Sequence, residues 1–257
     1  MGIETVLVAG ATGNVGAEVV RALRGVEVRA LSRRGTAVGD AVPVAGDLGD
    51  PRSVAHAWRG VDALFLPAGH PVELFADMRD AGVRQVVLLS TGAVVGDSGP
   101  AWTVLRPSGF MSNALQWTPL PDVVREPFAD VPVAVVDPAD IGAVAARALT
   151  DDGLAGHNLR LTGPAATLPA DRLAVLAELL GRDLRLEPEP DDEARARMGA
   201  ATPAAYVDAF FRFFRGGEYD DGRVTTVVPD LLGRPARTFR EWAEVHLDAF
   251  RAETVGS

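Results

Sequence analysis

Three glycines near the amino terminus constrain the fold more than any other feature of this sequence. The apolar run Thr5–Ala9 leads directly into the segment GATGNVG, and a helical pattern follows over Asn14–Arg24. Gly10, Gly13 and Gly16 are spaced three residues apart in that segment. Glycines let the backbone approach a pyrophosphate closely, and the helix that follows offers free N–H groups. The spacing therefore predicts an α/β fold, a doubly wound parallel-sheet Rossmann domain.

The first half of the chain alternates between strand and helix patterns, as expected for a parallel sheet with helices on both faces. Further strands are expected at 27–31, 42–45, 61–66, 83–89 and 101–105, and helices at 50–58 and 72–81. The second half is less regular. Its expected strands are 133–136, 158–161 and 184–186, and its expected helices are 137–149, 167–180 and 203–215. We expect a dinucleotide-binding domain over 1–150 and a smaller, mostly helical substrate or lid region with α/β character over 151–257.

The sequence predicts that one helix of the expected alternation is missing. Between Ser90 and Trp102 the chain has three glycines and a proline, which leave no room for a long helix. The shortened segment opens one wall of the expected cleft, which a second subunit or a flat substrate could cover. We therefore expect a homodimer.

The residues after the second expected strand indicate which dinucleotide binds. An Asp or Glu at this position accepts hydrogen bonds from the ribose hydroxyls of NAD. Here the chain has Ser32, Arg33 and Arg34 instead, so no acid repels a 2′-phosphate and two guanidiniums are placed to bind one. The sequence favours NADP(H) over NAD. The alternative is that both arginines are ordinary solvated surface residues.

Composition excludes several classes of function. The chain has no cysteine, hence no thiol chemistry, and all of its 25 Lys and Arg residues are arginines. A net charge of −10 argues against a broad nucleic-acid surface. No run of apolar residues is long enough to span a membrane, and no metal-ligand spacing is present. With no signal peptide at the start, we expect a cytoplasmic protein.

Several motifs together resemble one family. These are the glycine segment, the two arginines, Gly46-Asp47-Leu48 and the run Leu105–Asn113, with further similarity at 137–149, 161–164 and 233–242. The sequence resembles the NmrA-like group of atypical short-chain dehydrogenases/reductases, which includes NADPH-dependent reductases, tailoring enzymes of secondary metabolism and dinucleotide-sensing regulators. The resemblance spans nearly the whole chain.

The resemblance implies a set of cofactor-binding residues. They are Gly10, Thr12, Gly13, Asn14, Val15, Gly16, Ser32, Arg33, Arg34, Asp47, Leu48, Pro67, Ala68, Ser90, Pro107 and Phe110. Asp47 and Leu48 would lie beside the adenine, and Pro67 and Ala68 beside the adjacent ribose. Ser90 with Thr91 would face the nicotinamide.

The sequence departs from typical short-chain dehydrogenases in its catalytic residues. Those enzymes use a Tyr with a Lys four residues later, and this chain has no Lys. Candidate proton donors or hydrogen-bond partners are therefore His70, Ser90, Thr91 and Asn113. For His70 the alternative is an exposed loop histidine.

Aromatic residues predict a pocket for a small aromatic molecule. The expected pocket residues are Met111, Asn113, Trp117, Phe210 and Phe214. In the helix at 203–215 we expect Phe210 and Phe214 to share a face and Phe211 to lie outside it. Such a stripe is also typical of an ordinary core.

These observations favour an NADPH-dependent reductase of an aromatic, quinone-like or enone small molecule, acting in secondary metabolism. Two alternatives stay open. One is a tailoring enzyme that catalyses cyclisation or dimerisation without the Tyr/Lys pair. The other is a non-catalytic NADP(H) sensor or regulator.

Overall fold

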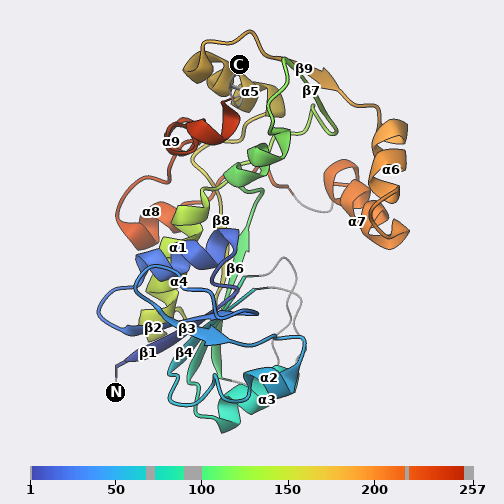
Figure 1. The fold of residues 1–257 in the computed structure, drawn as a ribbon. Coiled ribbons are helices and arrows are strands. Elements are labelled where there is room, and N and C mark those ends of the chain that lie inside the picture. Colours follow the sequence, from blue (N-terminus) through green and yellow to red (C-terminus); the bar gives the residue numbers. More distant parts are fainter. Residues whose placement is uncertain (1, 68–72, 90–99, 218–219, 252–257) are drawn as a thin grey trace, which may run out of the picture. The chain divides into compact units, whose positions relative to one another are not determined.

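The computed structural model describes residues 2–67, 73–89, 100–217 and 220–251, and these form two compact units (Figure 1). Unit 1 comprises Met1–Pro107, Pro138–Leu161 and Thr225–Ala236, and unit 2 comprises Ser108–Asp137, Thr162–Val224 and Arg237–Ser257. A single boundary at residue 150 does not describe these units. The chain leaves the large sheet after its sixth strand, returns to it with one helix and one strand, and returns again near the C-terminus.

Unit 1 is built on a seven-stranded sheet in which every strand pair is parallel. Its strands are β1 Thr5–Ala9, β2 Glu27–Ser32, β3 Val42–Ala45, β4 Ala63–Pro67, β5 Gln85–Leu89, β6 Ala101–Pro107 and β8 Asn158–Leu161. The spatial order β3-β2-β1-β4-β5-β6-β8 reverses direction between β1 and β4. This order confirms the predicted doubly wound Rossmann fold.

Helices cover both faces of this sheet (Figure 1). They are α1 Asn14–Ala22, α2 Pro51–Val54, α3 Glu73–Asp80, α4 Pro138–Thr150, the 3-10 helix η2 Asp152–Leu154 and α8 Val227–Leu232. The helix expected over 50–58 is shorter than predicted. After Val54 the Ala57 N–H donates to the carbonyl three residues earlier, at 2.8 Å, so the regular α-helical pattern ends there.

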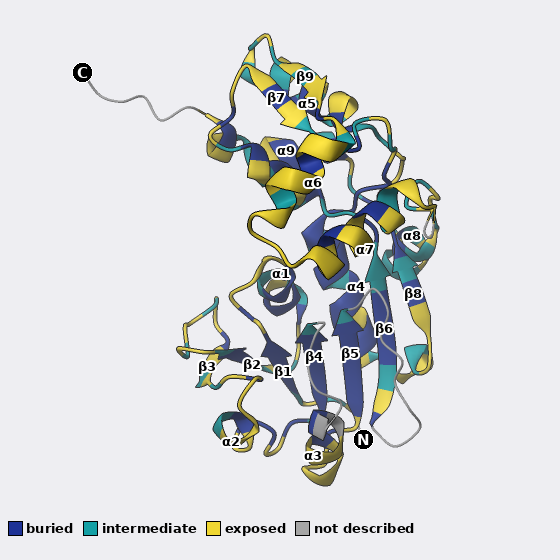
Figure 2. Cartoon of the chain, turned by 90° about the vertical axis from the view of Figure 1, so that its right-hand side faces the viewer, coloured by how far each residue is buried: buried dark blue, intermediate teal, exposed yellow. Residues whose placement is uncertain are grey.

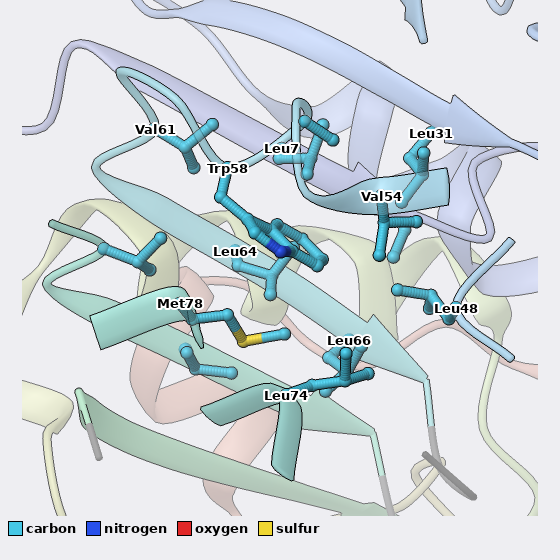
Figure 3. Packing of buried hydrophobic residues seen from close by; sticks show 14 of the residues in the cluster. Leu7, Leu31, Leu48, Val54, Trp58, Val61, Leu64, Leu66, Leu74 and Met78 are labelled. Carbon is cyan, nitrogen blue, oxygen red and sulfur yellow. The ribbon is translucent and has the colours of Figure 1, made fainter. Parts of the chain in front are cut away.

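The apolar core of unit 1 follows from the period of two in the strands. Leu7 on β1 and Leu64 and Leu66 on β4 face the same side, where they pack against Trp58 and Met78 (Figure 3). Figure 2 shows that the central strands β1, β4 and β5 are almost entirely buried. A sheet covered on both faces explains why these strands read as unbroken apolar runs.

Unit 2 contains short elements around its own apolar core. They are the 3-10 helix η1 Met111–Trp117, β7 Val123–Glu126, α5 Pro169–Leu180, β9 Arg185–Pro188, α6 Asp191–Gly199, α7 Ala204–Arg215, α9 Phe239–Val245 and the 3-10 helix η3 Leu247–Phe250. Strands β7 and β9 form a two-stranded parallel sheet. The segment expected as a strand at 133–136 forms only two isolated bridges, Phe110 with Val136 and Val133 with Thr167.

The burial pattern along α7 differs in part from the sequence expectation. In α7 it is Phe211 that is buried, with Val207 one turn before it, while Phe210 is 46% exposed. The helix therefore presents the i, i+4 pair of Val207 and Phe211 to the core. Phe210 and Phe214 share a face as predicted, with ring centroids 5.0 Å apart, but the burial of Phe211 was not expected. The missing helix after the fifth strand falls in residues 90–99, which lie outside the described residues.

The contact between α1 and α4 gives the first testable prediction. A Cβ at Gly142 in α4 would lie 2.6 Å from the backbone carbonyl carbon of Glu18 in α1, too close for any side chain. We expect Gly142→Ala to lower the free energy of unfolding by about 1–3 kcal/mol, because the helices must separate. Chemical denaturation measures this change.

The matched control is Gly199→Ala at the end of α6, where nothing lies within 4 Å of the added Cβ. We expect no loss of stability there. Equal effects of the two substitutions would contradict the close helix contact.

Candidate cofactor loop and substrate cavity

The glycine segment forms a tight turn at the carboxyl end of β1, beside the carboxyl end of β4. Gly10 has a φ of +63°, which strongly favours glycine, and a Cβ there would lie 3.0 Å from Cγ of Pro67. The Gly13 N–H donates to the Gly10 carbonyl at 2.9 Å and closes the turn. The turn therefore lies where the strand order reverses, which is the usual ligand position in open parallel sheets.

The same loop fits a pyrophosphate. A Cβ at Gly16 would lie 2.2 Å from the Gly10 carbonyl oxygen, so only glycine lets α1 start this close to the strand. Gly13 is the N-cap of α1 and has no side chain to satisfy the free N–H groups of the first turn. Thr12 and Asn14 are exposed at this turn, and Val15 is buried beneath it. The loop combines close backbone access with free donors, as a dinucleotide requires.

The end of β2 exposes the two predicted arginines. The Ser32 carbonyl accepts from the Gly35 N–H at 3.2 Å and the Gly46 N–H at 3.1 Å, and its hydroxyl accepts from Thr36. These bonds fix the turn that carries Arg33 and Arg34. Both arginines are exposed and form no ion pair or hydrogen bond with the rest of the described chain. Their guanidiniums are therefore available to a phosphate.

The remaining residues predicted to bind the cofactor differ in their solvent exposure and in their position in the fold. Asp47 is exposed and its carboxylate accepts from the Gly49 N–H at 2.9 Å. Leu48 instead belongs to the buried core of unit 1. Pro67 and Pro107 end β4 and β6 at the same edge of the sheet. Phe110 belongs to unit 2.

Four predicted residues lie outside the described residues. These are Ala68, His70, Ser90 and Thr91. The proposed roles of His70, Ser90 and Thr91 in catalysis stay predictions.

Unit 2 contains a cavity of about 440 Å³. Four of the five expected pocket residues line it, namely Asn113, Trp117, Phe210 and Phe214. Phe110 also lines it. Met111 does not, because its side chain is buried in the apolar core of this unit.

One side of the cavity is aromatic. Phe128 and Phe214 stack with ring centroids 4.8 Å apart, and Phe210 lies 5.0 Å from Phe214. Phe211 packs edge-on against Phe128 from behind, at 4.9 Å, and so holds the wall in place. Flat apolar surface of this kind suits a small conjugated or aromatic molecule.

The cavity is also lined by a carboxyl group, that of Glu126, which the sequence did not reveal. Glu126 ends β7, and its carboxyl accepts from the Trp117 indole N–H at 2.9 Å and from the Gln116 amide at 3.2 Å. Burial raises the pKa of Glu126, and the negative charge of Glu189 adds to the rise. The Trp117 hydrogen bond and the positive charges of Arg172 and Arg197 oppose it.

Arg172 in the first turn of α5 also lines the cavity. Its Nη1 donates to the Thr167 carbonyl at 2.8 Å and to the Thr167 hydroxyl at 3.1 Å. Burial lowers the pKa of this guanidinium below its ordinary value, although an arginine of this kind stays charged. The cavity therefore combines an aromatic wall with a half-buried acid, Glu126, and a half-buried cation, Arg172.

Sequence reasoning missed Glu126 and Arg172 because they are far apart in the chain. The one available signal was that Glu126 follows two apolar residues by two positions, in the run Val-Val-Arg-Glu-Pro. That signal is weak, because a single acid at a strand end is usually a solvated residue.

No helix in the described part of the chain is both long and apolar enough to cross a bilayer.

Comparisons with known proteins agree with this geometry. A family model described as NAD(P)H-binding matches residues 10–100. The (4-alkanoyl-5-oxo-2,5-dihydrofuran-3-yl)methyl phosphate reductase of Streptomyces griseus is 40% identical over 96% of this chain and 100% of its own length. The NAD(P)H azoreductase of Xenophilus azovorans is 31% identical over 96% of this chain and 99% of its own.

Solved structures show the same fold. The NADPH-dependent quinone oxidoreductase of Escherichia coli superposes with a TM-score of 0.76 at 22% identity, over 94% of this chain and 99% of that one. A negative transcriptional regulator, NmrA, in complex with NAD superposes with a TM-score of 0.68 at 18% identity, over 97% and 98% of the two chains.

The half-buried Glu126 gives a prediction about stability and pH. Since its pKa is raised in the folded state, the folded protein holds this proton more tightly than the unfolded chain. The associated stability is complete at low pH and is lost as the pH rises through the folded pKa. Glu126→Gln removes the charge but keeps an oxygen that accepts from Trp117. We expect its free energy of unfolding, relative to wild type, to increase from pH 4 to pH 8.

Denaturant unfolding at several pH values measures this difference. Glu193→Gln, at an exposed carboxylate of the same unit, is the control and should not show the same trend. A difference for Glu126→Gln that falls as the pH rises would contradict the argument.

Proposed function

The chain belongs to the NmrA-like group of NAD(P)H-binding, atypical short-chain dehydrogenases/reductases and is an NAD(P)H-dependent oxidoreductase, and from this premise we propose that it reduces an electron-poor double bond in a small acceptor with NADPH. One observation carries the proposal: the cavity of unit 2 is lined both by aromatic rings and by the half-buried carboxyl of Glu126, whose pKa is raised. A flat conjugated acceptor matches the wall, and its reduction needs a proton.

The substrate class is supported by the name of a relative. The acceptor named for the Streptomyces griseus reductase contains a ring double bond conjugated to a lactone carbonyl and to a ketone. Such a bond accepts a hydride at one carbon, because the adjacent carbonyls stabilise the enolate that results. The enone class predicted from the sequence includes this acceptor.

Unit 1 holds the cofactor in this proposal. The loop from Gly10 to Gly16 and the first turn of α1 bind the pyrophosphate, and Arg33 and Arg34 bind the 2′-phosphate. When bound, NADPH supplies a hydride. The preference for NADPH over NADH rests on the two arginines and on the lack of an acid at the end of β2.

Glu126 delivers the proton in this proposal. The chain has no lysine, so the Tyr/Lys pair of typical short-chain dehydrogenases is absent. A half-buried carboxyl with a raised pKa holds a proton at a pH where an exposed glutamate would have lost it, which suits a general acid. The acceptor gains hydride at one carbon, and the adjacent carbon of the enolate takes the proton from Glu126. Water then restores the acid.

The other candidate functions differ in whether product forms and whether NADPH is consumed. A quinone acceptor would also be reduced with net loss of NADPH, whereas a cyclisation or dimerisation would form product without that loss. A sensor would bind NADPH and form no product. A role in secondary metabolism, a homodimer and a cytoplasmic location stay predictions.

The reaction itself is the first prediction from this proposal. We expect the purified protein to oxidise NADPH in the presence of a 3-acyl-2(5H)-furanone, with one equivalent of saturated lactone formed. With NADPH deuterated at C4, mass spectrometry should find one deuterium on the ring carbon β to the carbonyls. Glu126→Gln should lower kcat by about 10²- to 10⁴-fold, with unchanged NADPH affinity.

Glu193→Gln is again the control and should keep the wild-type rate. NADPH loss without labelled product would overturn the proposed reaction. Full activity in Glu126→Gln would overturn the role of Glu126 as proton donor.

Cofactor preference is a separate prediction. We expect NADPH to bind more tightly than NADH, and the Arg33→Ala, Arg34→Ala double variant to lose roughly 10- to 100-fold in NADPH affinity with little change for NADH. Calorimetric titration measures both. Arg59→Ala is the control, since Arg59 is an exposed arginine just before β4, toward the opposite edge of the sheet. Equal affinity of wild type for both cofactors would disprove the role of the two arginines.

A further inference from the structure

We propose that the cavity of unit 2 contains a subsite for a phosphate monoester, in which Arg172 binds the phosphate group of the acceptor molecule. This rests on the proposed function, because it takes the cavity to be the acceptor site, and it adds the charge that the acceptor must carry.

Arg172 differs from the other arginines that line the cavity in its charge partners. Three arginines line it, Arg125, Arg172 and Arg197. Arg125 pairs with Glu193 at 2.8 Å, and Arg197 binds both carboxylate oxygens of Glu189, at 2.8 and 2.6 Å. Arg172 forms no ion pair with any residue that the structure describes. Among the described residues that line the cavity, Arg172 is therefore the arginine whose charge no carboxylate neutralises by direct contact.

The hydrogen bonds of Arg172 leave donors for a ligand. A guanidinium has five N–H groups, and the two bonds that the structure describes both leave from Nη1, toward Thr167. Nη2 and Nε keep their N–H groups without a partner among the described residues. Nε and Nη2 donate along one edge of the planar guanidinium, and two such donors match two oxygens of a phosphate.

Glu126 does not compete for these donors. Its carboxyl accepts from Trp117 and Gln116, and burial favours its protonated, neutral form. An anion at Arg172 would favour that form further, since it offsets the positive charge that helps to ionise Glu126. Phosphate binding and a protonated acid therefore support each other.

Half-burial makes this cation selective. A guanidinium removed from bulk water attracts an anion more strongly than an exposed one, because water screens the charge less. The aromatic wall of Phe128, Phe210 and Phe214 lines the same cavity of about 440 Å³. The combination fits a small molecule with a flat apolar part and a phosphate on a short arm, and it does not suit free inorganic phosphate, which leaves the wall uncovered.

Binding of model compounds tests the subsite without requiring turnover. The probes are benzyl phosphate, benzyl alcohol and inorganic phosphate, titrated by calorimetry into protein saturated with NADP⁺, so that the glycine loop of unit 1 is already occupied. We expect benzyl phosphate to bind at least 10-fold more tightly than either of the others. Arg172→Gln should weaken benzyl phosphate by roughly 10- to 100-fold and leave benzyl alcohol unchanged.

Two variants separate recognition from folding. Arg172→Lys keeps the charge and a donor toward Thr167 but loses the planar fork, and we expect an affinity between wild type and Arg172→Gln. Arg125→Gln removes an arginine that lines the same cavity but pairs with Glu193, and we expect the wild-type affinity. Equal affinity for benzyl phosphate and benzyl alcohol, or equal losses in Arg172→Gln and Arg125→Gln, would overturn the proposal. Inorganic phosphate binding as tightly as benzyl phosphate would overturn it too.

Failure of the proposed function gives a different result. If 3-acyl-furanones are not reduced while benzyl phosphate binds through Arg172, the reductase proposal fails and the anion subsite stands. If a neutral furanone is reduced as efficiently as its phosphomethyl counterpart, with Arg172→Gln unchanged on both, the reductase proposal stands and the subsite fails.

Discussion

The position of helix α1 depends on two backbone contacts that tolerate no side chain. At its start, Gly16 lies against the Gly10 carbonyl, and along its length Glu18 lies against Gly142 of α4. The first contact brings the helix N-terminus to the end of β1, and the second fixes the helix against the layer that covers the sheet. Phosphate binding by a helix N-terminus requires the free N–H groups to be held in one place, so the packing of α1 and the cofactor site share one cause.

The sequence predicted this part of the molecule well because its signals are local. Glycine spacing, apolar strand runs and the residues after β2 each act within a few positions, and β1 and β3 begin and end at the predicted residues. The division into units could not be predicted in the same way. It depends on where the chain returns to the sheet, and β8 and α8, which were expected in the second region, carry no local mark that assigns them to unit 1.

The cavity of unit 2 could be predicted from the sequence only in part. Its aromatic residues were expected from composition and helical spacing, but the burial of Phe211 was not, and Met111 turned out to belong to the core. Glu126 and Arg172 gain their character only from folding. Burial raises the pKa of Glu126. Arg172 forms no ion pair with a described carboxylate, whereas Arg197 pairs with Glu189 and Arg125 pairs with Glu193. Such properties depend on neighbours that are distant in the sequence.

In a chain without lysine, arginine is the only side chain that is positively charged at every physiological pH, and the proposed anion sites of the two units place arginines in different surroundings. Arg33 and Arg34 are exposed, so salt in solution screens their attraction for a phosphate. Arg172 is half-buried and less screened, and its orientation is fixed by two bonds to Thr167. A fixed planar donor loses little conformational freedom on binding, which favours one ligand geometry over others. The exposed pair therefore suits selection between two dinucleotides that are already held by the glycine loop, whereas the half-buried arginine suits selection of the acceptor itself.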